Sequence, residues 1–215
     1  MTNTTQPLSD TEQAALLARA KQWFVDDFIQ AHLKKVKQLR AKDLQPNPFL
    51  EAYLTTFLED EINANSRAKA LVLPRVLGTS VSTIFGTRMQ RFTTDVLSQV
   101  FGSTTSGIDI EFIDKITSDK VMAQVKLGPN TINKDDVETI NQHFLAARRL
   151  AKTNNLDTKK IVFAVGVMYG DENALSAHYK ALMEKHRYEV FAGQDFWHRL
   201  TGSPTFYQSL VQTFT

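Results

Sequence analysis

The sequence predicts an α/β fold in which helices flank a mixed β-sheet, with a large helical subregion at the N-terminal end. Three observations predict this class. Apolar side chains recur near the helical period through most of residues 9–100. Residues 106–112 and 121–127 instead alternate between apolar and polar side chains, which is typical of strands with one buried face. Residues 161–169 form an unbroken apolar run, as expected of a strand covered on both faces.

In the helical subregion, a capping sequence and periodic apolar residues predict a first helix over residues 9–42. A second helix is predicted over residues 49–63 and a third over residues 81–100. Pro74 and Gly78 are expected to interrupt the chain between the second and third helices.

The α/β part is predicted to open with a β-hairpin, because residues 114–120 form a polar turn between the two alternating segments. The elements expected after the hairpin are a helix, a strand, a helix, a strand and two closing helices. Their expected ranges, in that order, are 133–153, 161–169, 172–186, 188–191, 194–200 and 204–214.

The composition is that of a globular protein, since 42% of the 215 residues are hydrophobic and 22% are charged. A chain of this length can form one substantial domain. We therefore expect a helical subregion over residues 1–102 to pack on an α/β core over residues 103–215 as one domain.

Cysteine is absent, which excludes disulfides and thiolate chemistry and is typical of a reducing compartment. No apolar run approaches the ~20 residues of a membrane span, and residues 1–8 lack the core of a signal peptide. We therefore expect a cytoplasmic protein without a membrane segment. The net charge of +2 does not indicate a nucleic-acid binder, although basic clusters at residues 34–42 and 148–160 suit either phosphate contacts or solvated helix faces.

The polar face of the hairpin carries the chemistry. Pairing of the two strands is expected to bring Asp109, Glu111, Gln124 and Lys126 into one small volume. Asp109 would hold Mg²⁺, with the Gln124 side chain and the Val125 backbone carbonyl as further oxygen ligands. Lys126 would orient or activate a water and stabilise charge on a phosphate. The spacing alone is a weak signal, because exposed strand faces are commonly polar.

The hairpin, with Gly107-Ile108-Asp109 and Gln124-Val125-Lys126, resembles the core of the PD-(D/E)xK nuclease superfamily. Residues 126–136, Lys-Leu-Gly-Pro-Asn-Thr-Ile-Asn-Lys-Asp-Asp, resemble type II restriction endonucleases of the PmeII/TdeIII kind, and so does the tail over residues 191–207. The resemblance covers about residues 106–214 and implies a restriction-endonuclease-like sheet. It also implies a homodimer that cleaves double-stranded DNA at a specific sequence with a Mg²⁺-activated water. A DNA methyltransferase is expected in the same restriction-modification system. The helical subregion over residues 1–102 is expected to serve dimerisation or DNA contact, with one helix pair forming the dimer interface.

The resemblance implies that Asp109 is the metal-binding acid and Lys126 the catalytic lysine. Gln124 stands where the superfamily usually has Glu or Asp, and an amide binds Mg²⁺ more weakly than a carboxylate. Gln124 can be a tolerated ligand, assisted by Glu111, which is the arrangement we favour.

The second carboxylate of the site has further candidates. It can come from Glu111 alone, or from Glu59 or Glu61 in the helical half. The alternatives for function are a structure-specific repair nuclease of the same superfamily and a catalytically inactive DNA-binding protein.

Four polar residues follow the hairpin at a strand-to-helix junction, where free backbone N–H groups can bind a DNA phosphate. They are Asn130, Thr131, Asn133 and Lys134. Asn133 also has the residue type and position of an N-cap for the following helix, and both roles are compatible.

Overall fold

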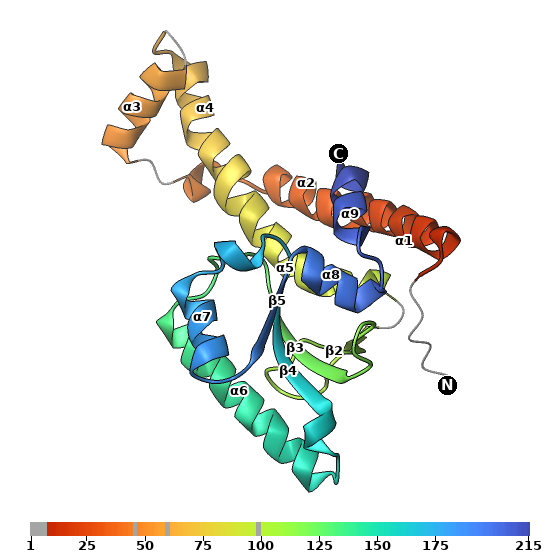
Figure 1. Cartoon of the computed structure of the whole chain (residues 1–215). Coiled ribbons are helices and arrows are strands. Elements are labelled where there is room, and N and C mark those ends of the chain that lie inside the picture. The colour runs from red at the N-terminus through yellow and green to blue at the C-terminus, as the bar shows by residue number, and fades with distance from the viewer. Residues whose placement is uncertain (1–7, 45–46, 59–60, 98–99) are drawn as a thin grey trace. The chain divides into compact units, whose positions relative to one another are not determined.

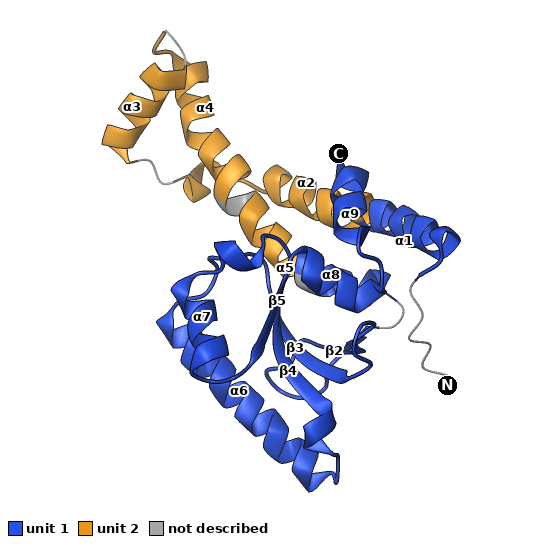
Figure 2. Cartoon of the chain, viewed as in Figure 1, with its two compact units in different colours: residues 1–23, 89–215 blue, residues 24–88 orange. Residues whose placement is uncertain are grey.

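The structure is a computed structural model that describes residues 8–44, 47–58, 61–97 and 100–215. It divides the chain into two compact units (Figure 2). One unit consists of residues 1–23 and 89–215, which we call the sheet unit, and the other of residues 24–88, which we call the helical unit. The expected limits at residues 102 and 103, and the packing of both parts as one domain, stay predictions.

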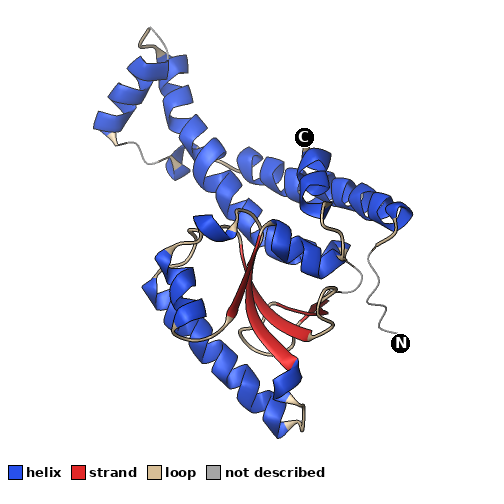
Figure 3. Cartoon of the chain, in the orientation of Figure 1, coloured by secondary structure: helices blue, strands red, loops and turns tan. Residues whose placement is uncertain are grey.

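A five-stranded mixed sheet lies in the centre of the sheet unit (Figures 1 and 3). Its order is β1-β2-β3-β4-β5, with β1, β2 and β3 antiparallel and β3, β4 and β5 parallel. The strands are β1 (Phe101–Gly102), β2 (Ile110–Ile113), β3 (Lys120–Lys126), β4 (Ile161–Val167) and β5 (Glu189–Ala192). The predicted α/β class and mixed sheet are confirmed, whereas β1 is too short for any sequence period to indicate it.

The register of the sheet assigns the hairpin residues to faces. Ile110 pairs with Ala123 across β2 and β3, and Glu111 pairs with Met122. On the other side of β3, Gln124 pairs with Val165. Because successive side chains of a strand alternate between faces, Met122, Gln124 and Lys126 share one face, as the sequence predicts.

That face is covered by α6 (Lys134–Thr153) and α7 (Ala177–Glu184) (Figure 1). Asn133 and Asp136 form a capping box that begins α6, because each side chain accepts a hydrogen bond from the other residue's backbone N–H. Buried apolar residues form one core between these two helices and the sheet. They include Met122, Ile140, Phe144, Phe163, Val165, Tyr179 and Leu182.

Four helical segments build the core on the opposite face: α1 (Asp10–Trp23), α8 (Gln194–Thr201), α9 (Phe206–Phe214) and residues 89–96 of α5 (Val81–Val96). Phe92 is fully buried there, and its ring centroid lies 4.9 Å from that of Trp23 and 5.8 Å from that of Trp197. Gly166 of β4 is required for this packing, because a Cβ atom at that position would overlap the Phe196 ring.

The helical unit continues from α1 through a π-helical segment (Phe24–Ile29) into α2 (Gln30–Lys37), so the first helix ends before the predicted residue 42. A 3-10 turn (Ala41–Asp43), α3 (Pro48–Leu58) and α4 (Ala64–Pro74) follow. The helix of residues 81–100 was predicted too long, since α5 ends at Val96, and residues 98 and 99 of that range lie outside the described part.

The predicted interruption at Pro74 and Gly78 is confirmed for the α-helix, because α4 ends at Pro74 and α5 begins at the predicted Val81. The chain stays helical from α4 into α5 through a π-helical segment, Arg75–Ser80. Pro74 is the last residue of α4, and its missing N–H and its ring affect the carbonyl of Ala70 one turn earlier. The proline therefore ends α4 here without ending the helical run.

This continuity gives one helical run, Ala64–Met89, whose length and mean hydropathy of 1.2 suffice for a membrane span. The sequence predicts no apolar run approaching this length. Only 6% of the most apolar window is buried within the chain. Length and composition alone assign no membrane to it, because core helices pass the same test.

A buried ion pair ties α8 to the turn of the hairpin. Asp114 directly follows β2 and is 1% exposed. One carboxylate oxygen accepts a hydrogen bond of 2.8 Å from the backbone N–H of Ile116, and the other accepts one of 2.7 Å from Nη1 of Arg199. The Arg199 guanidinium also lies 4.1 Å from the centroid of the Phe191 ring. These contacts fix the turn against the helix.

We predict that Arg199→Met destabilises the protein by about 3–5 kcal/mol, because it leaves the Asp114 carboxylate buried without its cation. Asp195→Ala is the matched control, since it removes the exposed partner of Arg199, at 3.1 Å, and should cost below about 1 kcal/mol. Urea unfolding measures both changes. Equal costs for the two variants would contradict the importance of the buried pair.

Candidate active site

Two hydrogen bonds attach Asp109 to the backbone of β3. It lies one residue before β2, and its N–H donates a hydrogen bond of 2.9 Å to the carbonyl of Ala123. Its side-chain Oδ2 accepts a hydrogen bond of 2.7 Å from the backbone N–H of Val125. The carboxylate is thereby positioned between Gln124 and Lys126 along the neighbouring strand, as the hairpin pattern predicts.

Burial raises the pKa of the Asp109 carboxyl above its ordinary value. The hydrogen bond from Val125 and the positive charge of Lys126 act in the opposite direction but do not outweigh burial. The ionised carboxylate is therefore incompletely compensated by the protein. A bound cation would supply the missing compensation.

The Gln124 side chain is 7% exposed and lies between the hairpin and α6. Its Nε2 donates a hydrogen bond to the carbonyl of Gly107 and lies 2.7 Å from Nδ1 of His143, a residue of α6. The sequence patterns did not assign His143 to the site. The available signal is its spacing, because it follows buried Ile140 by three residues and directly precedes buried Phe144 on the helix.

Lys126 ends β3, and its Nζ lies 3.9 Å from Oδ1 of Asp136 in the first turn of α6. The other oxygen of Asp136 accepts the capping hydrogen bond from the N–H of Asn133 at 2.8 Å. The same carboxylate thus caps the helix and attracts the lysine. This places the ammonium group at the edge where β3 meets α6.

The side chain of Glu111 has different partners from those of Asp109. Its Oε2 forms an ion pair of 2.7 Å with Nζ of Lys120, and its Oε1 accepts a hydrogen bond of 2.5 Å from Oγ of Ser103. The supporting role expected of Glu111 stays a prediction. The roles of Glu59 and Glu61 stay predictions too, because Glu59 lies outside the described residues and Glu61 belongs to the helical unit.

The four residues after the hairpin differ in how they are held. Oγ1 of Thr131 donates a hydrogen bond of 2.8 Å to the carbonyl of Gly128, and Asn133 caps α6 by accepting one of 3.0 Å from the N–H of Asp136. The predicted capping role of Asn133 is confirmed. Asn130 and Lys134 are exposed beside them, and contact of all four residues with DNA stays a prediction.

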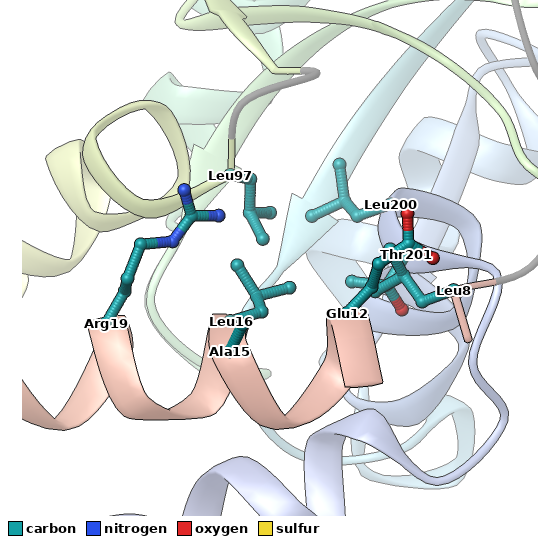
Figure 4. Close-up of a pocket in the computed structure, with 8 residues that line it drawn as sticks. All are labelled: Leu8, Glu12, Ala15, Leu16, Arg19, Leu97, Leu200 and Thr201. Carbon is teal, nitrogen blue, oxygen red and sulfur yellow. The ribbon is translucent and has the colours of Figure 1, made fainter. Parts of the chain in front are cut away.

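Two hollows of the sheet unit lie apart from these residues. One, of about 290 Å³, is lined largely by α1 and by Leu97 and Leu200 (Figure 4). The other, of about 560 Å³, lies where β4 and β5 end and includes Gly170 and Gln194. Neither hollow includes Asp109, Gln124 or Lys126 among its lining residues.

The donor set at Asp109 fits a hard divalent cation in its chemistry. A carboxylate, an amide oxygen of Gln124 and the backbone carbonyl of Val125 are oxygen ligands of the kind that Mg²⁺ uses, together with waters and substrate phosphates. Within the described residues, no three His, Asp or Glu side chains are grouped so that they could hold a metal ion. A cation here would therefore depend on backbone, amide and substrate oxygens beside a single carboxylate.

We predict that Lys120→Met lowers the free energy of unfolding by less than about 1 kcal/mol at neutral pH, because its ion pair with Glu111 is partly exposed. Partial burial raises the pKa of Glu111, but hydrogen bonds from Lys120 and Ser103 outweigh it and the net pKa is lowered. A lowered pKa stabilises the fold above the ordinary value of 4.5 and loses this effect as the pH falls through the folded value.

The difference between wild type and Lys120→Met should therefore vanish in acid, which urea unfolding across this pH range measures. Lys180→Met, at an exposed lysine of α7, is the control. A difference that persists unchanged well below pH 4 would show that the pair does not act through the charge of Glu111.

Comparison with protein families identifies the fold and its class. The family model of the type II restriction endonuclease EcoO109I matches residues 18–215. The match does not specify the PD-(D/E)xK group or the PmeII/TdeIII kind, and a comparison with curated proteins gave no match. Enzymes of this class are nucleases that act on DNA and generally use a divalent metal. The matched range spans most of the chain, which therefore belongs to the type II restriction endonuclease EcoO109I family.

Proposed function

We propose that the protein cleaves double-stranded DNA at a specific sequence, by Mg²⁺-dependent hydrolysis of one phosphodiester bond in each strand. The observation that carries this proposal is the approach of Asp109, Gln124 and Lys126 on one face of the hairpin, beside the first turn of α6. Family membership supports the class of reaction. In a PD-(D/E)xK nuclease, these residues would be the metal-binding acid, the second ligand and the catalytic lysine.

Each residue of the site has a distinct role in this proposal. Asp109, the amide oxygen of Gln124 and the carbonyl of Val125 hold the divalent cation. When bound, the cation neutralises charge on the scissile phosphate and acidifies a water. Lys126 orients the attacking water and stabilises the negative charge that develops on the phosphate oxygens. Asp136 holds the Lys126 ammonium at the edge of the sheet, at 3.9 Å.

We predict that Asp109→Asn and Lys126→Met abolish cleavage of unmethylated phage DNA, whereas Lys180→Met cuts like the wild type. Wild-type protein should give discrete fragments with Mg²⁺ and none with EDTA, as gel electrophoresis shows. Asp109→Asn should be folded, because its amide oxygen can still accept the hydrogen bond from the backbone N–H of Val125. Cleavage by either site variant at the wild-type rate would contradict the assignment.

The same assay separates the two alternative functions. A structure-specific repair nuclease would cut branched or nicked DNA without a fixed fragment pattern. A catalytically inactive DNA-binding protein would bind DNA equally with and without metal and cut none. The amide of Gln124 would indicate an inactive protein only if an amide could not serve as a metal ligand. The variant Gln124→Glu tests this, because it introduces the carboxylate that the superfamily usually has.

We propose that the junction after the hairpin contacts a DNA phosphate through Asn130, Thr131, Asn133 and Lys134. The free N–H groups at the start of α6 and the exposed ammonium of Lys134 favour an anion there.

Lys134→Ala should weaken DNA binding similarly on all sequences and lower the dependence of log K on log salt by about one unit. Fluorescence anisotropy at several salt concentrations measures this slope, with Lys180→Ala as the control. An unchanged slope for Lys134→Ala would contradict the phosphate contact.

We propose a homodimer in which the apolar face of α3 and α4 is buried against a second copy. α3 and α4 pack on each other, yet Phe49, Tyr53 and Phe57 of α3 are 85%, 62% and 71% exposed. A cluster of exposed aromatic side chains of this kind is typical of interaction surfaces. Two-fold symmetry of the protein would match a palindromic DNA target.

A DNA methyltransferase of the same specificity would protect the host DNA in the cytoplasm.

Phe57→Asp is expected to shift the protein from dimer to monomer in analytical ultracentrifugation, because it places a charge in the proposed interface. Phe101→Asp is the matched control, since Phe101 is 65% exposed but belongs to β1. A dimer that tolerates Phe57→Asp, or a wild type that is monomeric at all concentrations, would contradict this interface.

A further inference from the structure

An amide at a cation site raises a problem that a carboxylate does not. Both oxygens of a carboxylate attract a cation, whereas a glutamine side chain ends in one acceptor oxygen and one NH₂ donor. Rotation by half a turn exchanges the two ends and presents the wrong end to the cation. A glutamine ligand therefore depends on neighbours that fix its orientation.

Gln124 has two such neighbours. Its Nε2 donates to the carbonyl of Gly107, and a carbonyl only accepts hydrogen bonds, so this contact selects the NH₂ end. The second neighbour is Nδ1 of His143, 2.7 Å from the same nitrogen. A neutral imidazole protonated on Nε2 accepts from the amide at Nδ1, which agrees with the choice made by the carbonyl.

The position of His143 is itself fixed by packing. Ile140 and Phe144 on the same helix are 1% and 0% exposed, so the turn of α6 that carries His143 is held against the sheet. The imidazole ring lies over the backbone of Gly107, where a Cβ atom would overlap it. Gly107 has φ of +79°, which also favours glycine. The loop and the helix thus approach each other directly above Gln124.

We propose that His143 is a positioning residue, which together with the Gly107 carbonyl turns Nε2 of Gln124 toward the helix and leaves Oε1 for the divalent cation. His143 contacts neither the DNA nor the cation in this arrangement and acts only through Gln124. The inference rests on the proposed function, since it assumes that the site binds a divalent cation. It also explains how a glutamine serves where related nucleases have an acid.

The test is a double-mutant cycle on cation affinity, with Mn²⁺ alone as the probe and electron paramagnetic resonance as the readout. His143→Leu should weaken Mn²⁺ binding about tenfold, the range seen when a residue that orients a metal ligand is removed. His143→Asn should retain most of the affinity, because its side-chain oxygen can accept from the amide near the position of Nδ1. In a Gln124→Glu background, His143→Leu should cost several-fold less, because a carboxylate needs less orientation.

Equal losses from His143→Leu in both backgrounds would overturn the inference, and so would no loss in either. Circular dichroism melting confirms that each variant is folded, and His143→Asn provides a second test if His143→Leu is not. DNA cleavage is measured separately. If the variants show the expected differences in Mn²⁺ affinity but the wild-type protein cuts no DNA, the result would contradict the proposed function while supporting the role of His143.

Discussion

The hydrogen bond between the Asp109 carboxylate and the backbone N–H of Val125 is the contact on which the candidate site depends. It joins the residue before β2 to the middle of the polar stretch of β3, so the acid cannot move independently of Gln124 and Lys126. Asp109 is exposed to solvent, yet desolvation by the surrounding chain raises the pKa of its carboxyl. Such a penalty is typical of functional groups, because a ligand that must attract a cation is better left partly uncompensated.

Helix α6 contributes two side chains that contact the residues of the candidate site. Its first turn supplies Asp136, which caps the helix and attracts Lys126, and its third supplies His143, which contacts Gln124. Both contacts follow from one packing arrangement, in which Ile140 and Phe144 hold the helix on the sheet. The helix that covers the core therefore also contacts two of the three polar side chains of the candidate site, Gln124 and Lys126.

Much of the sheet unit could be predicted from the sequence, because alternation in residues 106–127 and the apolar run at 161–169 directly reflect strand burial. The same period agrees with the contact of Asp109 with the backbone of β3 between Gln124 and Lys126. His143 could not be predicted, since its contact with Gln124 depends on how α6 packs on the sheet and not on local sequence. The end of α4 at Pro74 could be predicted, whereas the π-helical segment that keeps the chain helical into α5 could not, because the proline rule concerns α-helices alone.

Sequencing of the DNA ends that purified protein produces on unmethylated genomic DNA with Mg²⁺ tests the central claim most directly. We expect ends that share one short palindromic sequence and carry 5′-phosphates, and no such ends from Asp109→Asn. Ends without a common sequence, or none at all in the presence of Mg²⁺, would contradict the assignment of this hairpin as the active site of a sequence-specific endonuclease.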